Sequence, residues 1–309
     1  MRRVGVLING NAKRAKRDPA LVGRLRRRLP ADRVRVTTDT AEVAPALEAL
    51  LGQALDVLVL VGGDGTMTGT LTAMLAAHDA EKLPPIAPAR GGTVNTVASS
   101  LGARGTPEQT VDALLRGDPF REERRAVVRV VADGGDPVHG FLFINGVGAR
   151  FLELYYHDSP MGPRGALSVL SRLTGSALSG GPLARRVFEP FEAEAIVDGV
   201  PLEARSFTMI GASGVRHIGL GFPVFDTAGS DPERIHLITT DASPARVALD
   251  LPALRAGRPG RSLSHASVRR VELRLATPLA WTIDADFFPP ARRLEIEAGP
   301  ALRIRTPRA

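Results

Sequence analysis

The chain has 309 residues, of which 44% are hydrophobic and 24% charged, and its formal net charge is +7 at pH 7. This is the composition of a folded globular protein, so intrinsic disorder is excluded, and the length predicts two domains. Because cysteine is absent, disulfides, thiolate zinc sites and cysteine nucleophiles are excluded, and a reducing compartment is compatible with the sequence.

No apolar run approaches the roughly 20 residues of a membrane-spanning helix, and the apolar stretch from Val4 to Ile8 is too short for a signal-peptide core. We therefore expect a cytoplasmic protein whose membrane contact, at the inner surface, is peripheral at most. The basic excess is almost all arginine spread along the chain, which is typical of solvated faces, and contact with an anionic membrane stays open. With 5% aromatic residues there are few platforms for stacking bases, so no nucleic-acid partner is expected.

The first third of the chain alternates short apolar runs with segments of helical period, which indicates a parallel sheet covered on both faces. The predicted strands are 4–8, 34–36, 56–61 and 86–88, and the predicted helices are 20–29, 41–51 and 67–77. Such sheets bind ligands at the carboxyl ends of their strands. Four polar loops should therefore share one rim: Asn9 to Ala12, Thr37 to Thr40, Gly62 to Thr66, and Gly91 to Asn95.

After about residue 125 the pattern becomes β-rich and mainly antiparallel, with strands predicted at 126–131, 140–145, 192–197 and 206–211. The predicted fold class is therefore α/β with two domains. Residues 1–125 should form a doubly wound domain, and residues 126–291 a β-rich domain in which Trp281 packs. Helical stretches at 151–156 and 166–177 are flanked by Pro and Gly. They are either packing helices or a mobile cap over an apolar acceptor site, in which Tyr155 and Tyr156 line or close the cleft.

The loop Gly62-Gly63-Asp64-Gly65-Thr66 lies between a predicted buried strand and a helix. Glycines there let backbone amides approach phosphate oxygens, and the helix directs its positive end to the same place. Asp64 would repel phosphate, so its carboxylate is better suited to Mg²⁺ or its water shell. The alternative is a tight turn in which Asp64 caps a helix. The loop from Gly91 to Asn95 repeats the pattern, with Thr93 able to donate to phosphate and Asn95 to bridge backbone, substrate or metal-bound water.

Other catalytic signatures are absent from the sequence. There is no Walker A loop, no His-Arg-Asp, no Gly-x-Ser-x-Gly and no His-Glu-x-x-His. The histidines are scattered, as surface or hydrogen-bonded structural histidines usually are; they are His78, His139, His157, His217, His236 and His265.

These motifs resemble the bacterial diacylglycerol kinase and sphingosine kinase superfamily, whose hallmark is the Gly-Gly-Asp-Gly-Thr loop; NAD kinases share its core. The similarity extends over essentially the whole chain. Its further segments are Asn9-Gly10-Asn11-Ala12-Lys13, Thr38, Gly92-Thr93-Val94-Asn95, Phe143 to Gly148, Gly219 to Phe222, and Asp284-Ala285-Asp286 in place of the family's Asp-Gly-Glu.

The resemblance implies ATP and Mg²⁺ as cofactors, with ATP held between the two domains. It also implies that a final strand at 292–304 returns to the first domain, so that residues 292–309 belong to that domain. It implies Asp286 as general base and Asp64 as the second catalytic residue and a metal ligand. Asp231, in the segment 226–233, is a candidate ligand of a structural Mg²⁺. The implied ATP-binding residues are Asn9, Gly10, Asn11, Ala12, Lys13, Thr38, Gly62, Gly63, Asp64, Gly65, Thr66, Gly92, Thr93 and Asn95.

Three positions depart from the family pattern. Thr96 and Arg125 stand where aspartates are usual, and Asp286 is shorter than the usual glutamate by one C–C bond. Three functions therefore stay open: an ATP-dependent kinase of a diacylglycerol-like lipid, a kinase of a soluble polar acceptor with NAD-kinase-like chemistry, and a nucleotide-binding protein that has lost catalysis. The oligomeric state is open too, with a homodimer as one option.

Overall fold

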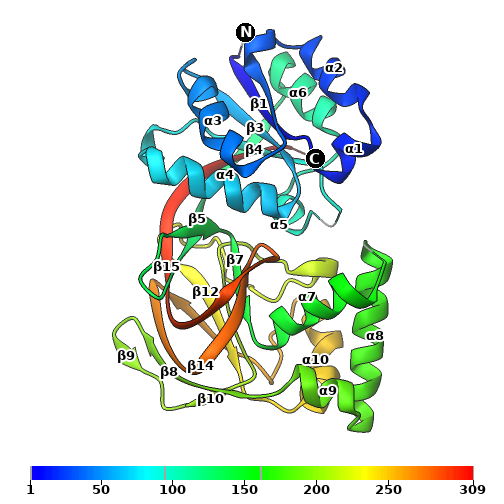
Figure 1. Cartoon of the computed structure of the whole chain (residues 1–309), viewed down its shortest axis with the longest axis vertical. Helices are drawn as coiled ribbons and strands as arrows, with labels where there is room; N and C mark the ends of the chain where they lie inside the picture. Colours follow the sequence, from blue (N-terminus) through cyan, green and yellow to red (C-terminus); the bar gives the residue numbers. More distant parts are fainter. Residues whose placement is uncertain (1, 94, 161, 309) are drawn as a thin grey trace. The chain divides into compact units, whose positions relative to one another are not determined.

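The computed structural model describes residues 2–93, 95–160 and 162–308, so Val94 of the second predicted phosphate loop lies outside the described residues. The chain divides into two compact units (Figure 1). The first consists of Met1–Arg125 with Pro300–Ala309, and the second of Ala126–Gly299. The boundaries fall inside two long strands, β5 (Phe120–Ala132) and β15 (Asp286–Pro307), which pair with each other.

The first unit contains the predicted parallel sheet, in the strand order β4-β3-β1-β2. Its strands are β1 (Val4–Asn9), β2 (Val34–Thr37), β3 (Val57–Gly62) and β4 (Ile86–Arg90). The end of β15 adds a further parallel strand beside β4, where Ile304 is in register with Ile86. All six residues of β3 are buried, as expected for a strand with both faces covered.

The helices of this unit are α1 (Lys13–Arg17), α2 (Ala20–Arg26), α3 (Val43–Leu51), α4 (Asp64–Ala77), α5 (Thr96–Ser100) and α6 (Pro107–Arg116). Short 3₁₀ turns lie at Ala31–Arg33, Thr40–Glu42 and Ala80–Lys82. The helix predicted at 20–29 ends earlier, at Arg26. In the helix predicted at 41–51, the first residues belong to a 3₁₀ turn and the α-helix begins at Val43. The helix predicted to begin at Met67 begins at Asp64, because Gly63 is its N-cap and donates its amide to the Thr66 hydroxyl.

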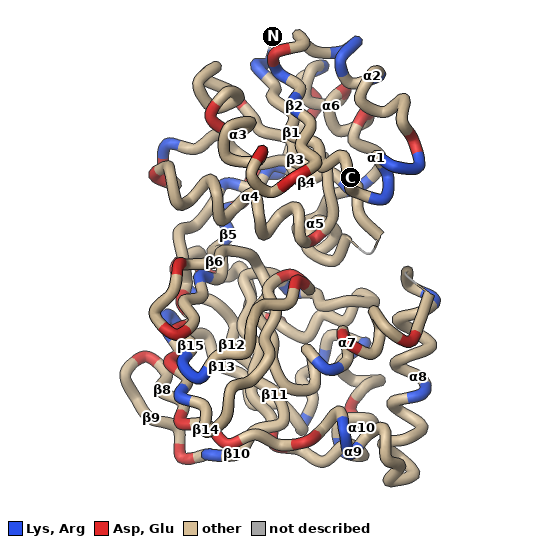
Figure 2. The backbone as a smooth tube through the Cα atoms, in the orientation of Figure 1, with Lys and Arg blue, Asp and Glu red and all other residues tan. Residues whose placement is uncertain are grey.

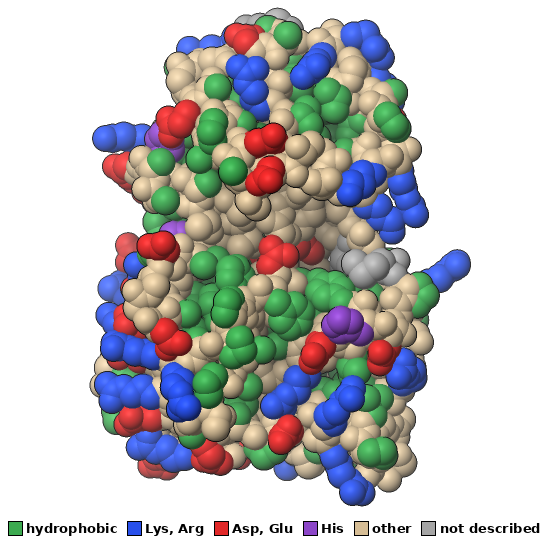
Figure 3. Space-filling view, in the orientation of Figure 1, with side chains coloured by type: hydrophobic (Ala, Val, Ile, Leu, Met, Phe, Trp, Pro, Cys, Tyr) green, Lys and Arg blue, Asp and Glu red, His purple; other side chains and the backbone are tan. Residues whose placement is uncertain are grey.

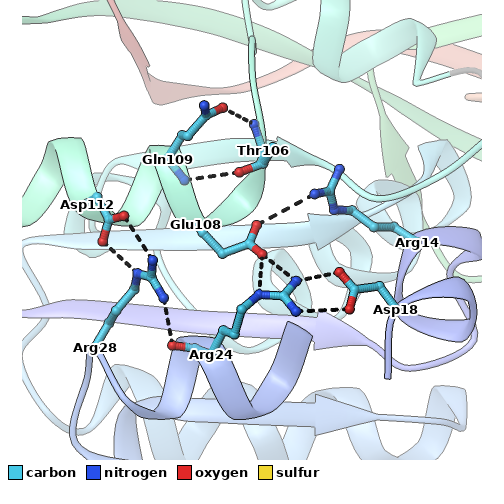
Figure 4. A network of polar contacts seen from close by, with 8 residues as sticks. All are labelled: Arg14, Asp18, Arg24, Arg28, Thr106, Glu108, Gln109 and Asp112. Atoms are coloured by element: carbon cyan, nitrogen blue, oxygen red, sulfur yellow. Dashed lines mark hydrogen bonds and ion pairs between the residues drawn. The ribbon is translucent and has the colours of Figure 1, made fainter. Parts of the chain in front are cut away.

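An ion-pair network fastens α2 to α6 (Figure 4). Glu108 of α6 is only 9% exposed, and its Oε1 accepts a 3.0 Å hydrogen bond from Nε of Arg24, which also pairs with Asp18. Arg28 pairs with Asp112 of α6 at 2.6 Å. Burial by itself would raise the pKa of Glu108, but the hydrogen bond from Arg24 holds it below its usual range. Basic and acidic residues are both spread along the described parts of the two units (Figure 2).

The second unit is built on antiparallel pairs in the strand order β13-β12-β11-β7-β14-β15. Its strands, besides β5 and β15, are β6 (Val138–Gly140), β7 (Leu142–Asn145), β8 (Phe191–Val197), β9 (Val200–Pro201), β10 (Ser206–Phe207), β11 (Met209–Ser213), β12 (Ile235–Thr240), β13 (Ser264–Val268) and β14 (Arg270–Ile283). Trp281 packs in the core of this unit, as predicted, with 2% of its surface exposed. The α/β fold class with a parallel and an antiparallel part is confirmed.

Two predicted strands are each divided. The run 140–145 breaks at Phe141, whose amide donates to the buried carboxylate of Asp284 instead of a strand. The run 206–211 becomes β10 and β11, because the chain stops pairing with β8 and begins to pair with β7 and β12.

The second unit also carries α7 (Val147–Asp158), α8 (Pro163–Ser179), α9 (Pro182–Val187), α10 (Pro244–Arg255) and the 3₁₀ turn Gly219–Gly221. The helical stretches predicted at 151–156 and 166–177 lie inside α7 and α8 and are confirmed as helices. Among the described residues, every helix falls short of the length and apolar character needed to cross a membrane.

Candidate nucleotide and catalytic sites

The four polar loops of the first unit meet at one rim of its sheet. The Gly10 amide donates to the Thr37 carbonyl at 2.8 Å, which joins the loops after β1 and β2. The Gly91 amide donates to the Gly62 carbonyl at 2.9 Å, and the Arg14 amide donates to the Gly91 carbonyl at 2.9 Å. Direct backbone hydrogen bonds therefore connect the loops that the sequence placed together.

The glycines of the two phosphate-type loops allow the loops to pack against each other. A Cβ on Gly92 would lie 2.4 Å from Cα of Gly63, and a Cβ on Gly91 would lie 2.8 Å from the nitrogen of Gly62. A Cβ on Gly62 would lie 2.3 Å from the side chain of Thr66. Real Cβ contacts are longer than this, so larger residues would force the loops apart. The sequence suggested that these glycines open the backbone to phosphate, and the structure adds contact between the loops as a second requirement.

Thr66 lies half-buried at the start of α4 with its hydroxyl oriented by two donors. Nδ2 of Asn9 donates to Thr66 Oγ1 at 2.8 Å, and the Gly63 amide donates to the same oxygen at 3.3 Å. A hydroxyl has two acceptor lone pairs and one proton. Both lone pairs are engaged here, so the proton is the part of this hydroxyl that is suited to a phosphate oxygen.

Asp64 connects the two loops through its carboxylate. Its Oδ2 accepts from the Thr96 amide and its Oδ1 from the Val97 amide, both at 3.0 Å. These amides begin α5, so Asp64 caps a helix that follows the other loop. Asn95 occupies the N-cap position of α5 in the left-handed conformation, with φ 55°, and its Oδ1 accepts from the Gly92 amide at 2.7 Å. The helix-cap alternative for Asp64 thus agrees with its hydrogen bonds, although the helix that it caps in this way is not the one beginning at Asp64.

The other predicted nucleotide residues surround this core of the rim. The Asn11 amide donates to Oδ1 of Asn9 at 2.8 Å, which shapes the first loop, and Lys13 is the first residue of α1. The Thr38 hydroxyl is exposed and donates to Glu42 at 3.3 Å. Ala12 is buried, Gly65 lies in the first turn of α4, and Thr93 is half-buried.

In the second unit, Asp286 begins β15 directly after a two-residue turn. Ile283 is in register with Asp286, and the turn residues Asp284 and Ala285 have φ of 48° and 73°, as type I′ hairpin turns require. Asp284 is 2% exposed, and its Oδ1 accepts from the amides of Phe141 at 2.9 Å and Leu142 at 2.8 Å. This buried carboxylate fixes the turn that presents Asp286.

The Asp286 carboxylate is exposed to solvent but lies among enough protein atoms for desolvation to raise its pKa above the ordinary value of 3.8. The ring of Phe287, 42% exposed, contacts Tyr156 of α7 edge to face, with ring centres 6.1 Å apart. The Tyr156 hydroxyl donates to the Ala285 carbonyl at 3.1 Å. The candidate base therefore lies next to an exposed aromatic pair.

The two tyrosines of the predicted cap differ in environment. Tyr155 is 3% exposed, and its hydroxyl accepts from the Gly162 amide at 2.6 Å, which holds the start of α8 to α7. Tyr156 is 38% exposed beside the β14–β15 turn. Tyr155 thus packs α7 against α8, and Tyr156 is the tyrosine that lies near Asp286.

Asp231, the candidate metal ligand, accepts the Glu233 amide at 2.8 Å and stabilises a turn. Among the described residues, the group that could hold a metal ion consists of Asp226, His236 of β12 and His265 of β13, with ligand atoms within 4.8 Å of one another. Neither histidine was predicted as a ligand. The sequence signal available is that each histidine lies in a short strand, β12 or β13. The register that pairs the two strands and brings the histidines together cannot be read from one sequence.

The rim of the first unit defines a class of fold: an α/β domain with a Gly-Gly-Asp-Gly-Thr loop at the carboxyl end of a buried strand, where such sheets bind ligands. Residues 3–127 match the family described as diacylglycerol kinase catalytic domain. Over that segment, the resemblance seen in the sequence is confirmed.

Solved structures share the fold over nearly the whole chain. A diacylglycerol kinase from Bacillus anthracis str. Sterne matches with a TM-score of 0.62 at 14% identity, covering 97% of this chain and 96% of that one. Two structures of candidate diacylglycerol kinases from the same organism match with TM-scores of 0.68 and 0.67 at 14% and 13% identity. They cover 97% of this chain and 96% and 94% of theirs. No curated protein matches the sequence.

Proposed function

We propose that the protein is an ATP-dependent lipid kinase that transfers the γ-phosphate of ATP to a hydroxyl of a diacylglycerol-like acceptor. The observation that carries the proposal is the rim of interlocked glycine loops inside a segment that matches the diacylglycerol kinase catalytic domain. Phosphoryl transfer needs alignment and charge neutralisation more than covalent chemistry from the protein. A rigid set of donors at a sheet edge suits that requirement.

On the nucleotide side, the Thr66 hydroxyl and the backbone of the two glycine loops are the proposed phosphate contacts. Lys13, at the start of α1, would add positive charge beside the first loop. When bound, Mg²⁺ would neutralise phosphate charge. Asp64 fits such an ion best through its water shell, because both carboxylate oxygens already accept amide hydrogen bonds from the start of α5.

On the acceptor side, Asp286 is the proposed general base. The acceptor oxygen forms a bond to the γ-phosphorus, the bond from that phosphorus to the β–γ bridging oxygen breaks, and the hydroxyl proton passes to the Asp286 carboxylate. Desolvation raises the pKa of Asp286, which brings the carboxylate closer to the basicity that proton abstraction needs. Its position directly after a fixed type I′ turn supports a precise role.

A lipid acceptor is supported by the surface around Asp286. Hydrophobic side chains gather on the face of the second unit shown in Figure 3. Tyr156 and Phe287 are among the exposed large hydrophobic residues and contact each other next to the base. Exposed aromatic pairs favour ligands with an apolar part.

One observation favours a nucleotide-binding protein without catalysis as the second candidate. Thr96 stands where the family usually has aspartate, and its amide takes up one oxygen of Asp64. Arg125, at the other departure, pairs with Glu123. Fewer acids are thus free to bind metal near the rim.

The test is transfer of labelled phosphate from ATP to a panel of diacylglycerol, sphingoid, prenol and polar acceptors, with ATP affinity measured in parallel. We expect labelled lipid, and we expect Asp286→Asn to lose transfer while it binds ATP normally. Asp136→Asn, which changes an exposed acid in a turn of the same unit, is the matched control and should keep full activity. Label only in polar acceptors would reject the lipid assignment, and ATP binding without any transfer would select the second candidate.

A further inference from the structure

Two histidines meet on neighbouring strands at the edge of the second unit's sheet. In the β12–β13 pair, His236 is in register with Ser267 and His265 with Ile238, so the histidines are diagonal neighbours on one face. His236 Nε2 lies 3.0 Å from His265 Nδ1, and the ring centres are 5.2 Å apart. His236 is 1% exposed and His265 is half-buried.

Asp226, in the segment before β12, completes the group. Its Oδ1 lies 3.3 Å from His236 Nδ1, and 37% of its side chain is exposed. The Thr227 amide donates to the same Nδ1 at 3.1 Å, and the Thr227 hydroxyl lies 2.7 Å from it. That nitrogen therefore carries no proton, and a bound ion would replace these hydrogen bonds.

This arrangement leaves two electron-rich atoms facing each other. A carboxylate oxygen and an unprotonated imidazole nitrogen repel each other at 3.3 Å, and a cation between them would turn this repulsion into attraction. Asp226 Oδ1 and His265 Nε2 are both buried and lack a hydrogen-bond partner among the described residues. Buried polar atoms without partners are uncommon in folded proteins, and an ion is one of the things that can satisfy them.

The geometry points to a divalent transition-metal site formed by Asp226, His236 and His265, with Zn²⁺ as the type of ion that it fits. Two imidazoles and one carboxylate are ligands that suit zinc, whereas Mg²⁺ prefers oxygen ligands alone. Zinc bonds to nitrogen and oxygen are about 2.0–2.2 Å, so two tetrahedral ligands lie roughly 3.3 Å apart. The Asp226–His236 separation of 3.3 Å matches that spacing, and all three ligand atoms lie within 4.8 Å of one another.

The proposed ion has a structural consequence for the sheet. β13 is the edge strand of the second unit, with β12 as its neighbour in the sheet order, and edge strands are the least secured part of a sheet. A bound ion would tie β13 to β12 and to the segment that carries Asp226. Binding to the folded state alone would raise the melting temperature of this unit.

The test uses the full chain, freed of metal with a chelator and titrated with Zn²⁺ and with Co²⁺, whose visible absorption reports nitrogen ligands. We expect one Co²⁺ per chain with an intense visible band, displacement by Zn²⁺, and a melting temperature several degrees higher with Zn²⁺. His265→Gln is the main variant, because His265 lies on an exposed edge strand where substitution should leave folding intact. It should weaken metal binding by more than the roughly 10–100-fold that loss of an outer-shell contact costs.

Asp231→Asn is the matched control, since Asp231 lies in the same segment and its carboxylate serves a turn. It should bind Co²⁺ as the unmodified protein does, whereas Asp226→Asn should bind more weakly. Absence of stoichiometric binding would overturn the proposal and leave the three groups as a hydrogen-bonded chain. Unchanged affinity in His265→Gln, or loss of binding in Asp231→Asn but not in Asp226→Asn, would also overturn it.

Discussion

Replacing Asp64 by alanine should destabilise the first unit before any question of metal binding arises. The substitution removes acceptors from the amides of Thr96 and Val97, both at 3.0 Å. A hydrogen bond to a charged group contributes about 1.5–3 kcal/mol, and loss of a helix cap costs about 0.5–2 kcal/mol. Because Asp64 is half-buried and water can replace part of the loss, we expect a cost of about 2–3 kcal/mol for the two bonds together. Asp64→Asn keeps one carbonyl acceptor and should cost about 1 kcal/mol.

Calorimetry and far-ultraviolet circular dichroism measure this effect. For a unit of this size the alanine variant should lower the melting temperature by roughly 5–10 °C. Trp281 lies in the core of the other unit, so its fluorescence provides an internal reference that should change little. The matched control is Asp79→Ala, which removes a single exposed cap, the 3.1 Å bond from the Glu81 amide, and should cost under about 1 kcal/mol.

Activity alone cannot separate the roles of Asp64, because Mg²⁺-dependent ATP turnover should be abolished whether the residue binds metal or holds the loops. The melting temperature decides between them. Suppose that Asp64→Ala has the same melting temperature as the unmodified protein but no turnover. The hydrogen bonds from Asp64 to the start of α5 would then not stabilise the unit, and Asp64 would act on the metal alone.

The remaining predictions concern the loops, the base and the turn. Gly92→Ala should abolish ATP binding and destabilise the first unit, because the new Cβ would lie 2.4 Å from the Cα of Gly63. Its control is Gly69→Ala in helix α4, where the new Cβ would meet nothing within 4 Å and should raise the free energy of unfolding by about 0.5–1 kcal/mol. Equal melting temperatures for the two variants would contradict the packing argument. Asp286→Asn should lower kcat about 10²–10⁴-fold, and Asp286→Glu should retain activity. In the unmodified protein kcat should fall as pH falls through a pKa above 3.8, because protonation removes the base, and a pH profile that Asp286→Asn leaves unchanged would reject this role. Ala285→Gly should raise the free energy of unfolding by about 1 kcal/mol, because Ala285 has φ 73°, a conformation that strains alanine but not glycine. A lower melting temperature of the variant would show that the turn is unstrained.

The sequence was sufficient for the fold class and for the rim of the first unit. Alternating periods predicted β3 and the helices around it, and the carboxyl-end rule placed the Gly62 and Gly91 loops together. The exact ends of helices and strands were not predictable. Helix α4, for example, begins at Asp64 because the Gly63 amide donates to the Thr66 hydroxyl in its first turn.

Contacts between distant segments could not be predicted. The bond from Asp64 to Thr96 spans 32 positions and depends on how closely two glycine loops approach. The meeting of His236 with His265 depends on the register of an edge strand, which one sequence does not specify. The split of 140–145 at Phe141 likewise required knowledge of where the Asp284 carboxylate would lie.

The long strand β15 has a consequence for how the chain is made. Its last residues lie in the segment Pro300–Ala309, which belongs to the unit that otherwise ends at Arg125, and Ile304 pairs with Ile86. A nascent chain emerging from the ribosome cannot finish this sheet until residues 300–307 have been synthesised, although most of the unit's residues are made earlier. Removing residues 300–309 should therefore damage the N-terminal sheet, and residues 1–125 expressed by themselves should lack the strand that residues 300–307 supply.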